Sequence, residues 1–273
     1  MNKKTKDPFV DKNIGLDKVV GNEIECNKRV LQPTGKKYAE VIFLGDVHYG
    51  SPECNVKKFK KMLAYCLRKE VYVILMGDML EAATKTSVAA GWAEQEHILQ
   101  KQYEDMLEFL KPLAKKRLII GSLSGNHERR IWISSGLDVG KLMCRELKIP
   151  YLGSACWNVL TVGKQKYSVY ALHGRTAAQS DGTVLTTAKR LAAPFHADVY
   201  AMGHAHRCVD GISLTQHVDM FHKRVVQRKK FVIITGSYLD YGGYWKERGG
   251  EISKIGSPKV KFFSEQHKIH ISW

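Results

Sequence analysis

The chain has 273 residues, of which 44% are hydrophobic and 10% aromatic, an ordinary globular composition that allows a sizeable core. Its 43 Lys and Arg outnumber 27 Asp and Glu, so the formal net charge is +16. Such an excess attracts phosphate-rich partners, namely nucleic acid, nucleotides or an anionic membrane surface, although a lysine-rich start at residues 1–6 contributes to it. No apolar run reaches the roughly 20 residues that a membrane span needs, and no apolar signal region opens the chain.

The cysteine pattern excludes a zinc ribbon and a redox motif, because no CxxC pair occurs. Several cysteines stand in apolar stretches, where Cys behaves as a small core residue. We therefore expect a reduced, intracellular protein in the cytoplasm. The cysteines are Cys26, Cys54, Cys66, Cys144, Cys156 and Cys208.

The first half of the chain predicts alternating strands and helices. Residues 1–37 are polar and read as an N-terminal extension or an edge element, and residues 38–273 as one domain. Short apolar runs at 39–45, 71–77 and 117–123 predict buried strands. Apolar residues at helical spacing predict helices over 55–69, from about 91 to 116, and over 137–147.

The second half is richer in strands. Strands are predicted at 158–162, 166–172 and 198–202, with a helix over 183–193. After His206, alternating segments at 207–218, 224–238 and 259–273 predict a second, largely antiparallel sheet. Two packed sheets with helices outside follow from this order.

A polar cluster follows each of the first three predicted strands and two later ones. In open α/β sheets, ligand sites lie at the carboxyl ends of strands. Carboxylates and neutral imidazoles bind Mn, Fe, Zn and related divalent metals. Pairs at i and i+2 point the same way on an extended chain, and Asp78 is the candidate bridge between two ions. The clusters are Asp46 with His48, Asp78 with Glu81, Asn126 with His127 and Glu128, His173 alone, and His204 with His206.

The series GDVH, GDMLE, GNHE, LHG and GHAH, spread over residues 40–207, resembles the signature of the calcineurin-like metallophosphoesterase superfamily. The resemblance implies an α/β fold, a four-layer α/β/β/α sandwich of two mixed sheets with a dinuclear metal site at the strand ends. It also implies an enzyme that hydrolyses phosphoesters.

Carried over residue by residue, the resemblance implies two metal sites. One ion would be held by Asp46, His48 and His206, the other by Asn126, His173 and His204, with Asp78 bridging both. His127 would contact the phosphate and help to protonate the leaving group. Glu128 stands where many members of the superfamily have Asp, and we expect it to orient His127.

The expected cofactors are two divalent metal ions, Mn foremost, with Fe, Zn, Ni or Mg as alternatives. A bridging water with a lowered pKa would then supply the attacking hydroxide near neutral pH, so no Ser or Cys nucleophile is required. Among the arginines that follow the motifs, Arg129, Arg175 and Arg207 are candidates for binding substrate phosphate, with ion pairs as the alternative role.

Two further segments have open interpretations. Residues 236–250, rich in Tyr, Trp and Gly, could stack nucleobases over the cleft or could tuck into the edge of the sandwich. The run at 223–230, KRVVQRKK, could face nucleic acid or be the solvated side of a hairpin.

The positive charge favours a phosphodiesterase or nuclease acting on nucleic acid or nucleotides. A phosphomonoesterase or phosphoprotein phosphatase is the alternative, and a non-catalytic binding module is disfavoured because every expected ligand position is filled. A lipid-linked substrate would call for an apolar, membrane-facing insertion, and none is obvious in the sequence. The sequence leaves the native metal and the oligomeric state open.

Overall fold

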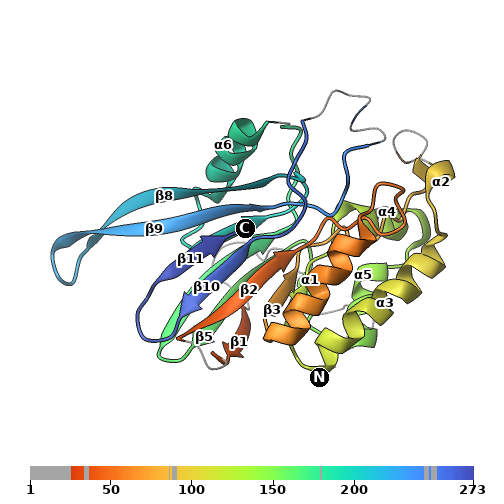
Figure 1. The fold of residues 1–273 in the computed structure, drawn as a ribbon. Helices are drawn as coiled ribbons and strands as arrows, with labels where there is room; N and C mark the ends of the chain where they lie inside the picture. Colours follow the sequence, from red (N-terminus) through yellow and green to blue (C-terminus); the bar gives the residue numbers. More distant parts are fainter. Residues whose placement is uncertain are drawn as a thin grey trace, which may run out of the picture.

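Two β-sheets pack face to face, and helices cover their outer faces (Figure 1). The computed structural model describes residues 26–273 apart from 34–36, 86, 88–90, 179, 243–245 and 247–250. The layers run helix, sheet, sheet, helix, so the predicted four-layer α/β/β/α sandwich is confirmed.

The five-stranded sheet has the order β11-β10-β2-β3-β4 and is mixed. Its parallel core consists of β2 (Tyr38–Leu44), β3 (Tyr72–Leu75) and β4 (Ile119–Ser122). The strands β10 (Lys259–Phe263) and β11 (Ile269–Ser272) extend it in antiparallel fashion.

The six-stranded sheet has the order β1-β5-β6-β7-β9-β8 and is also mixed. The neighbours β6, β7 and β9 run parallel, and β8 pairs with β9 as an antiparallel hairpin. Its strands are β1 (Asn27–Leu31), β5 (Ala155–Val162), β6 (Gln165–Leu172), β7 (Val199–Met202), β8 (Cys208–Asp219) and β9 (Arg224–Thr235).

Local sequence explains the helices. In α1, the Asn55 side chain accepts a hydrogen bond from the Lys58 amide at 2.9 Å, which caps the first turn. Phe59, Leu63 and Cys66 then bury one face of α1. The helices are α1 (Val56–Lys69), α2 (Gly91–Glu94), α3 (Leu99–Lys115), α4 (Asn126–Ser135), α5 (Val139–Leu147) and α6 (Asp181–Ala192).

Three apolar clusters separate the layers. The first lies between the five-stranded sheet and the helices α1, α3, α4 and α5, and the second between the two sheets. The third joins α6 to the outer face of the six-stranded sheet. Within the described part of the chain, none of the helices combines the length and hydropathy that a membrane span requires.

The structure differs from the sequence prediction in the assignment of the late strands. The segments after His206 do not form one antiparallel sheet, because β8 and β9 join the six-stranded sheet while β10 and β11 join the five-stranded one. Residues 27–31 form the edge strand β1, in agreement with the edge element that was one of the two interpretations of residues 1–37, although Leu31 is fully buried. Residues 1–25 lie outside the described residues.

Two helices also differ from the prediction. The helix predicted over 91–116 is interrupted between α2 and α3, because the Glu96 amide donates to the Gly50 carbonyl at 2.8 Å. The side chain of Gln102 donates to the His97 carbonyl at 2.7 Å and holds the same break. The helix α4 was not predicted, since it buries only Glu128 and Ile131 and lacks an apolar stripe.

Candidate metal centre

The candidate ligands follow β2, β3, β4, β6 and β7, at the carboxyl ends of parallel strands from both sheets. They lie on loops, except for Asn126, which begins α4. Five of them have a left-handed backbone conformation, with φ from 49° to 67°. This conformation costs about 1–3 kcal/mol per non-glycine residue and clusters at functional sites. The five are Asp46, His48, Asp78, His204 and His206.

Glycine permits the close approach of two of these loops. Gly125 precedes α4 and lies against the Asp78 carboxylate, so that a β-carbon at this position would overlap it. The Asp78 Oδ1 then accepts a hydrogen bond from the His127 amide at 2.8 Å. The first turn of α4 is therefore held directly against the loop after β3.

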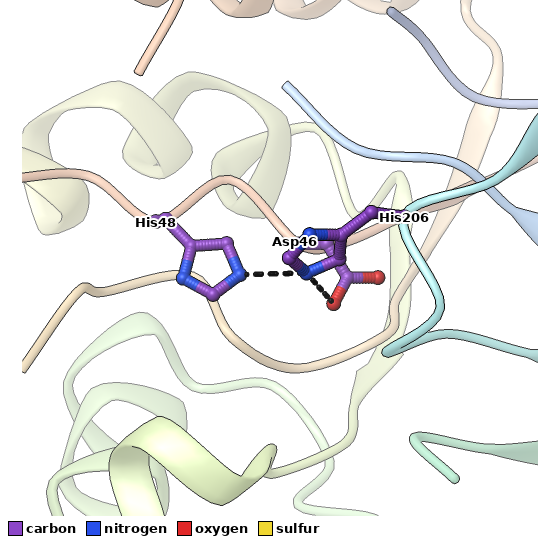
Figure 2. A group of neighbouring side chains, drawn as sticks. All are labelled: Asp46, His48 and His206. Carbon is purple, nitrogen blue, oxygen red and sulfur yellow. Dashed lines mark hydrogen bonds and ion pairs between the residues drawn. The ribbon is translucent and has the colours of Figure 1, made fainter. Parts of the chain in front are cut away.

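The first group of side chains consists of Asp46, His48 and His206 (Figure 2). The Nε2 atoms of His48 and His206 lie 3.1 Å apart, and His206 Nε2 is 3.5 Å from Asp46 Oδ1. Asp46 also accepts hydrogen bonds from the His204 amide at 3.0 and 3.1 Å. Three donor atoms thus converge on one point, as a metal site requires.

The second group consists of Asp78, His173 and His204. His173 Nε2 lies 3.2 Å from Asp78 Oδ2. The side-chain oxygen of Asn126 lies 3.0 Å from His173 Nε2 and 2.8 Å from His204 Nδ1. All seven predicted ligands therefore lie close together. A third group of convergent donors, His48, Asp78 and His127, links the first group to the second.

Asp78 lies between the two groups. Its Oδ2 atom is buried and accepts no hydrogen bond from a described group. The nearest nitrogens are His173 Nε2 at 3.2 Å, in the second group, and His48 Nε2 at 3.8 Å, in the first. A buried carboxylate oxygen without a donor is costly unless a cation neutralises it. The donor set and this orphaned oxygen both fit divalent metal ions.

Two of the imidazoles, those of His48 and His173, have a raised pKa while no metal is bound. Burial alone would lower the pKa of His48, but the hydrogen bond to Glu81 and the carboxylates around it raise it to about 9. Burial of His173 is likewise outweighed, chiefly by Asp78, and its pKa is about 10. Burial would raise the pKa of Asp78, yet His127, His173 and His48 hold it well below the ordinary value. The site thus balances its carboxylates with cations.

Glu81 takes part in the site in a way that the sequence did not assign. Its Oε2 lies 3.0 Å from His48 Nδ1, which leaves His48 Nε2 free to face the metal position. Metal-binding histidines characteristically donate their other ring nitrogen to such a carboxylate. The motif GDMLE contained the signal, but only the fold places Glu81 beside His48.

Glu128 does not orient His127, contrary to the sequence expectation. As the third residue of α4, its side chain turns back to accept from the Gly125 amide at 2.9 Å. It also accepts from the amides of Asp78, Met79 and Leu80 at 2.8–3.2 Å. Glu128 therefore holds the loop after β3 to the start of α4.

His127 is instead positioned by the Glu81 backbone and by Arg130. Its Nδ1 lies 2.6 Å from the Glu81 carbonyl, and its Nε2 lies 2.5 Å from Arg130 Nη2. Since the carbonyl can only accept, Nδ1 carries the hydrogen and Nε2 accepts from Arg130. Burial lowers the pKa of His127 to about 4, so the metal-free ring is neutral.

A comparison with protein-family profiles identifies the family of this chain. The profile described as "Calcineurin-like phosphoesterase" matches residues 39–208, which include every candidate ligand. The chain belongs to the calcineurin-like phosphoesterase family. It is accordingly a metal-dependent phosphoesterase, a hydrolase whose Asp and His clusters can hold divalent metal.

Solved structures with weak likeness to this phosphoesterase span most of the chain. A conserved uncharacterised protein, described as a predicted phosphoesterase, from Streptococcus pneumoniae TIGR4 is 13% identical with a TM-score of 0.37, over 86% of this chain and 88% of that one. Vacuolar protein sorting 29 from Cryptosporidium parvum is 14% identical with a TM-score of 0.38, over 86% and 96%.

A protein serine/threonine phosphatase from Saccharomyces cerevisiae is 10% identical with a TM-score of 0.34, over 91% and 83%. These likenesses carry no conclusion about the substrate of this phosphoesterase. A search of curated proteins found no significant match.

The three predicted substrate-binding arginines of the phosphoesterase lie in different surroundings. Arg129 on α4 and Arg175 after β6 are exposed. Arg207 is buried, with Nε 2.6 Å from Asp181 Oδ1 and Nη2 2.7 Å from Glu251 Oε2. These ion pairs already occupy its guanidinium, the alternative role that the sequence left open.

A cavity of about 310 Å³ adjoins the first metal group of the phosphoesterase. His48, His127 and His206 form part of its wall, and Arg130 contributes a cation. The rest of the wall includes Ser51, Glu53, Glu81, Glu94, Ser237, Leu239, Asp240 and Tyr241. In the segment 236–250, Tyr238 is buried in the core while Tyr241 reaches the cavity, and much of the remainder lies outside the described residues.

Proposed function

We propose that this phosphoesterase is a dinuclear phosphodiesterase that cleaves nucleic acid or nucleotides, with Mn²⁺ as its foremost metal. The observation that carries the proposal is the buried Oδ2 of Asp78, which accepts no hydrogen bond and lies between two groups of convergent donors. Asp46, His48 and His206 would hold one ion, Asn126, His173 and His204 the other, and Asp78 both. When bound, the two ions lower the pKa of a water to supply hydroxide and polarise the phosphoryl oxygens.

His127 and Arg130 would act on the substrate. Both line the cavity, and His127 Nε2 already accepts a hydrogen bond from Arg130. A phosphate beside them would draw the guanidinium away, because Arg binds phosphate oxygens in a forked geometry. The negative charge of the phosphate would also raise the pKa of His127, so that Nε2 could carry a proton to the leaving oxygen.

The distribution of charge limits how a polyanion could approach. Among the described residues of the cavity wall, Arg130 is the one Lys or Arg, and the wall also carries Glu53, Glu94 and Asp240. A continuous strand of phosphates would be repelled by these carboxylates. The cavity therefore suits the end of a nucleic acid or a single nucleotide, whose base and sugar would lie beside the carboxylates.

A substrate panel tests this proposal. Single-stranded DNA, duplex DNA, RNA, cyclic nucleotides and phosphomonoesters would be compared with Mn²⁺ present, with Asp78→Asn as the inactive control. Turnover of a phosphodiester, faster at chain ends or on nucleotides than inside long duplexes, is expected. Faster turnover of phosphomonoesters or a phosphopeptide than of any phosphodiester would contradict the proposal, although not the family assignment.

A further inference from the structure

The β8–β9 hairpin projects far beyond the rest of the six-stranded sheet (Figure 1). Its register pairs Cys208 with Thr235 at the base and Asp219 with Arg224 at the far end. Twelve residues per strand at about 3.4 Å each give a ribbon of roughly 40 Å. Neighbouring groups contact its base, where α6 packs on one face and Trp273 donates to Asp210 on the other.

The far end of the hairpin, residues 218–225, which we name the hairpin tip, exposes large apolar side chains. Met220 and Phe221 are 81% and 88% exposed in the turn. The paired Val218 and Val225 behind them are 58% and 64% exposed. Hairpin turns ordinarily carry Gly, Asn, Asp or Ser, so an apolar turn of this kind points to a partner.

Two backbone amides of the turn find their acceptor within it. The Asp219 carboxylate accepts hydrogen bonds from the amides of Phe221 and His222, both at 3.1 Å. It also lies 2.8 Å from His222 Nδ1 and 3.8 Å from Arg224 Nε. A segment that enters an apolar medium must be paired internally in this way.

Cations lie within the hairpin tip, next to its apolar turn, and behind it. Lys223, Arg224, Arg228 and Lys229 are exposed, whereas Asp219 is engaged by the turn. The part of the hairpin far from its base at Asp210 therefore carries a strongly positive charge. An apolar end with a cationic zone directly behind it matches the order of acyl chains and anionic headgroups in a bilayer leaflet.

We propose that the hairpin tip docks this protein on an anionic bilayer surface. The Val218–Val225 pair lies two to three residues behind the turn, or about 7–10 Å at 3.4 Å per residue. Interfacial elements insert by about 5–10 Å. The turn therefore reaches deep enough to place Met220 and Phe221 among the upper acyl chains. The valine pair would then lie at the boundary with the headgroups, where Lys223 and Arg224 also lie.

The structure favours a bilayer surface over two other partners of the hairpin tip, a second copy of the chain and nucleic acid. A second copy of the chain would bring two equally basic hairpins together, which charge repulsion opposes. Nucleic acid would match the cations but would leave the apolar side chains of Val218 and Val225 against polar grooves. The proposal is independent of which phosphoester the active site cleaves.

Vesicle sedimentation tests the proposal. The wild-type protein should sediment with vesicles of phosphatidylcholine and phosphatidylglycerol and much less with phosphatidylcholine alone. Met220→Ser with Phe221→Ser should weaken partitioning roughly 100-fold, because two large apolar side chains no longer leave water. Lys223→Gln with Arg228→Gln should weaken it roughly fivefold for each charge removed. In Phe221→Trp, the added indole fluorescence should be quenched by lipids brominated on the acyl chain.

The matched control removes two exposed apolar side chains elsewhere. Ile98 and Ile133 are 70% and 69% exposed, and Ile98→Ser with Ile133→Ser should sediment like wild type. Turnover of a water-soluble chromogenic phosphodiester should be unchanged in the tip variant, which establishes that it is folded.

Three results would overturn the proposal. One is no sedimentation of the wild type at low salt, and another is equal sedimentation of the tip and control variants. The third is a tip variant that loses oligonucleotide binding, or changes from dimer to monomer by light scattering, with unaltered vesicle binding.

Discussion

Truncation of Glu81 tests whether the carboxylate behind His48 sets the metal affinity. Glu81 Oε2 lies 3.0 Å from His48 Nδ1, and this hydrogen bond is the strongest influence that raises the pKa of His48. Partners of this kind typically account for about 10–100-fold in metal affinity. Glu81→Ala should therefore weaken Mn²⁺ binding by about 10–100-fold, or about 1.4–2.7 kcal/mol.

The Glu81 variants separate the carboxylate from the backbone. The Glu81 carbonyl holds His127, and this contact does not involve the side chain. Glu81→Gln retains an acceptor for His48 without the charge, so it should fall between wild type and Glu81→Ala. Glu94 lines the same cavity as an exposed carboxylate, and Glu94→Ala is the matched control.

The assay is a Mn²⁺ titration of phosphodiester turnover, with metal affinity measured separately by calorimetry. Glu81→Ala should need more Mn²⁺ to reach half of its maximal rate, and the rate at saturating Mn²⁺ should approach wild type. A low rate at saturating Mn²⁺ with unchanged metal affinity would refute the positioning role and place Glu81 on the substrate instead.

Further predictions concern the metal ligands, His127 and Arg207. Exhaustive chelation should abolish phosphodiester turnover, and Mn²⁺ should restore it. Asp78→Asn should lower metal content and rate more than any other ligand variant. An Asp78→Asn protein close to wild type in both would refute the bridging role. His127→Ala should keep its metal and lose about 10²–10⁴-fold in rate with alkyl leaving groups but less with nitrophenyl, and an equal loss would exclude proton transfer. Because His48 and His173 have pKa values of about 9 and 10 in the metal-free site, metal binding should release protons, as calorimetry in several buffers can measure, and affinity should rise with pH. Both values lie above the ordinary 6.5, so the stabilisation that these charges give the metal-free protein is complete below about pH 6.5 and is lost as the pH rises through about 9–10. Arg207→Ala should lower the free energy of unfolding by about 1.5–3 kcal/mol, measured by urea denaturation, with little change in rate below the transition; a rate loss without destabilisation would return Arg207 to substrate binding.

The candidate ligands could be found from sequence because each follows a short apolar run that ends in a turn. Parallel strands bring such turns to one edge, so Asp46, Asp78 and Asn126 could be expected to meet. The left-handed backbone at these positions could not be predicted, since nothing in a GD or GHAH motif distinguishes it from an ordinary turn. It becomes understandable only when both sheets are in place.

Other features depend on contacts between distant segments. Glu128 was expected to orient His127 because many members of the superfamily have Asp at this position, yet a helix directs consecutive side chains apart. The partners of Arg207, Asp181 and Glu251, lie 26 and 44 residues away along the chain. The predicted strands end at 218 and begin again at 224, but the sequence does not show that the apolar side chains of the turn between them are exposed.

The distribution of the ligands along the chain has a consequence for biosynthesis. The loops that carry Asp46, Asp78 and Asn126 belong to one sheet, whereas His173, His204 and His206 follow strands of the other. A nascent chain that has emerged only as far as β4 carries only the ligands that belong to the first sheet. The loops that bear them would still lack the sheet that packs opposite. Bringing Asp46 and His206 together closes a loop of 160 residues, which costs chain entropy. Long-range packing must offset this cost before the site can form. Metal loading should therefore follow the docking of the two sheets, and metal content in a cell would report how much of the protein has completed its fold.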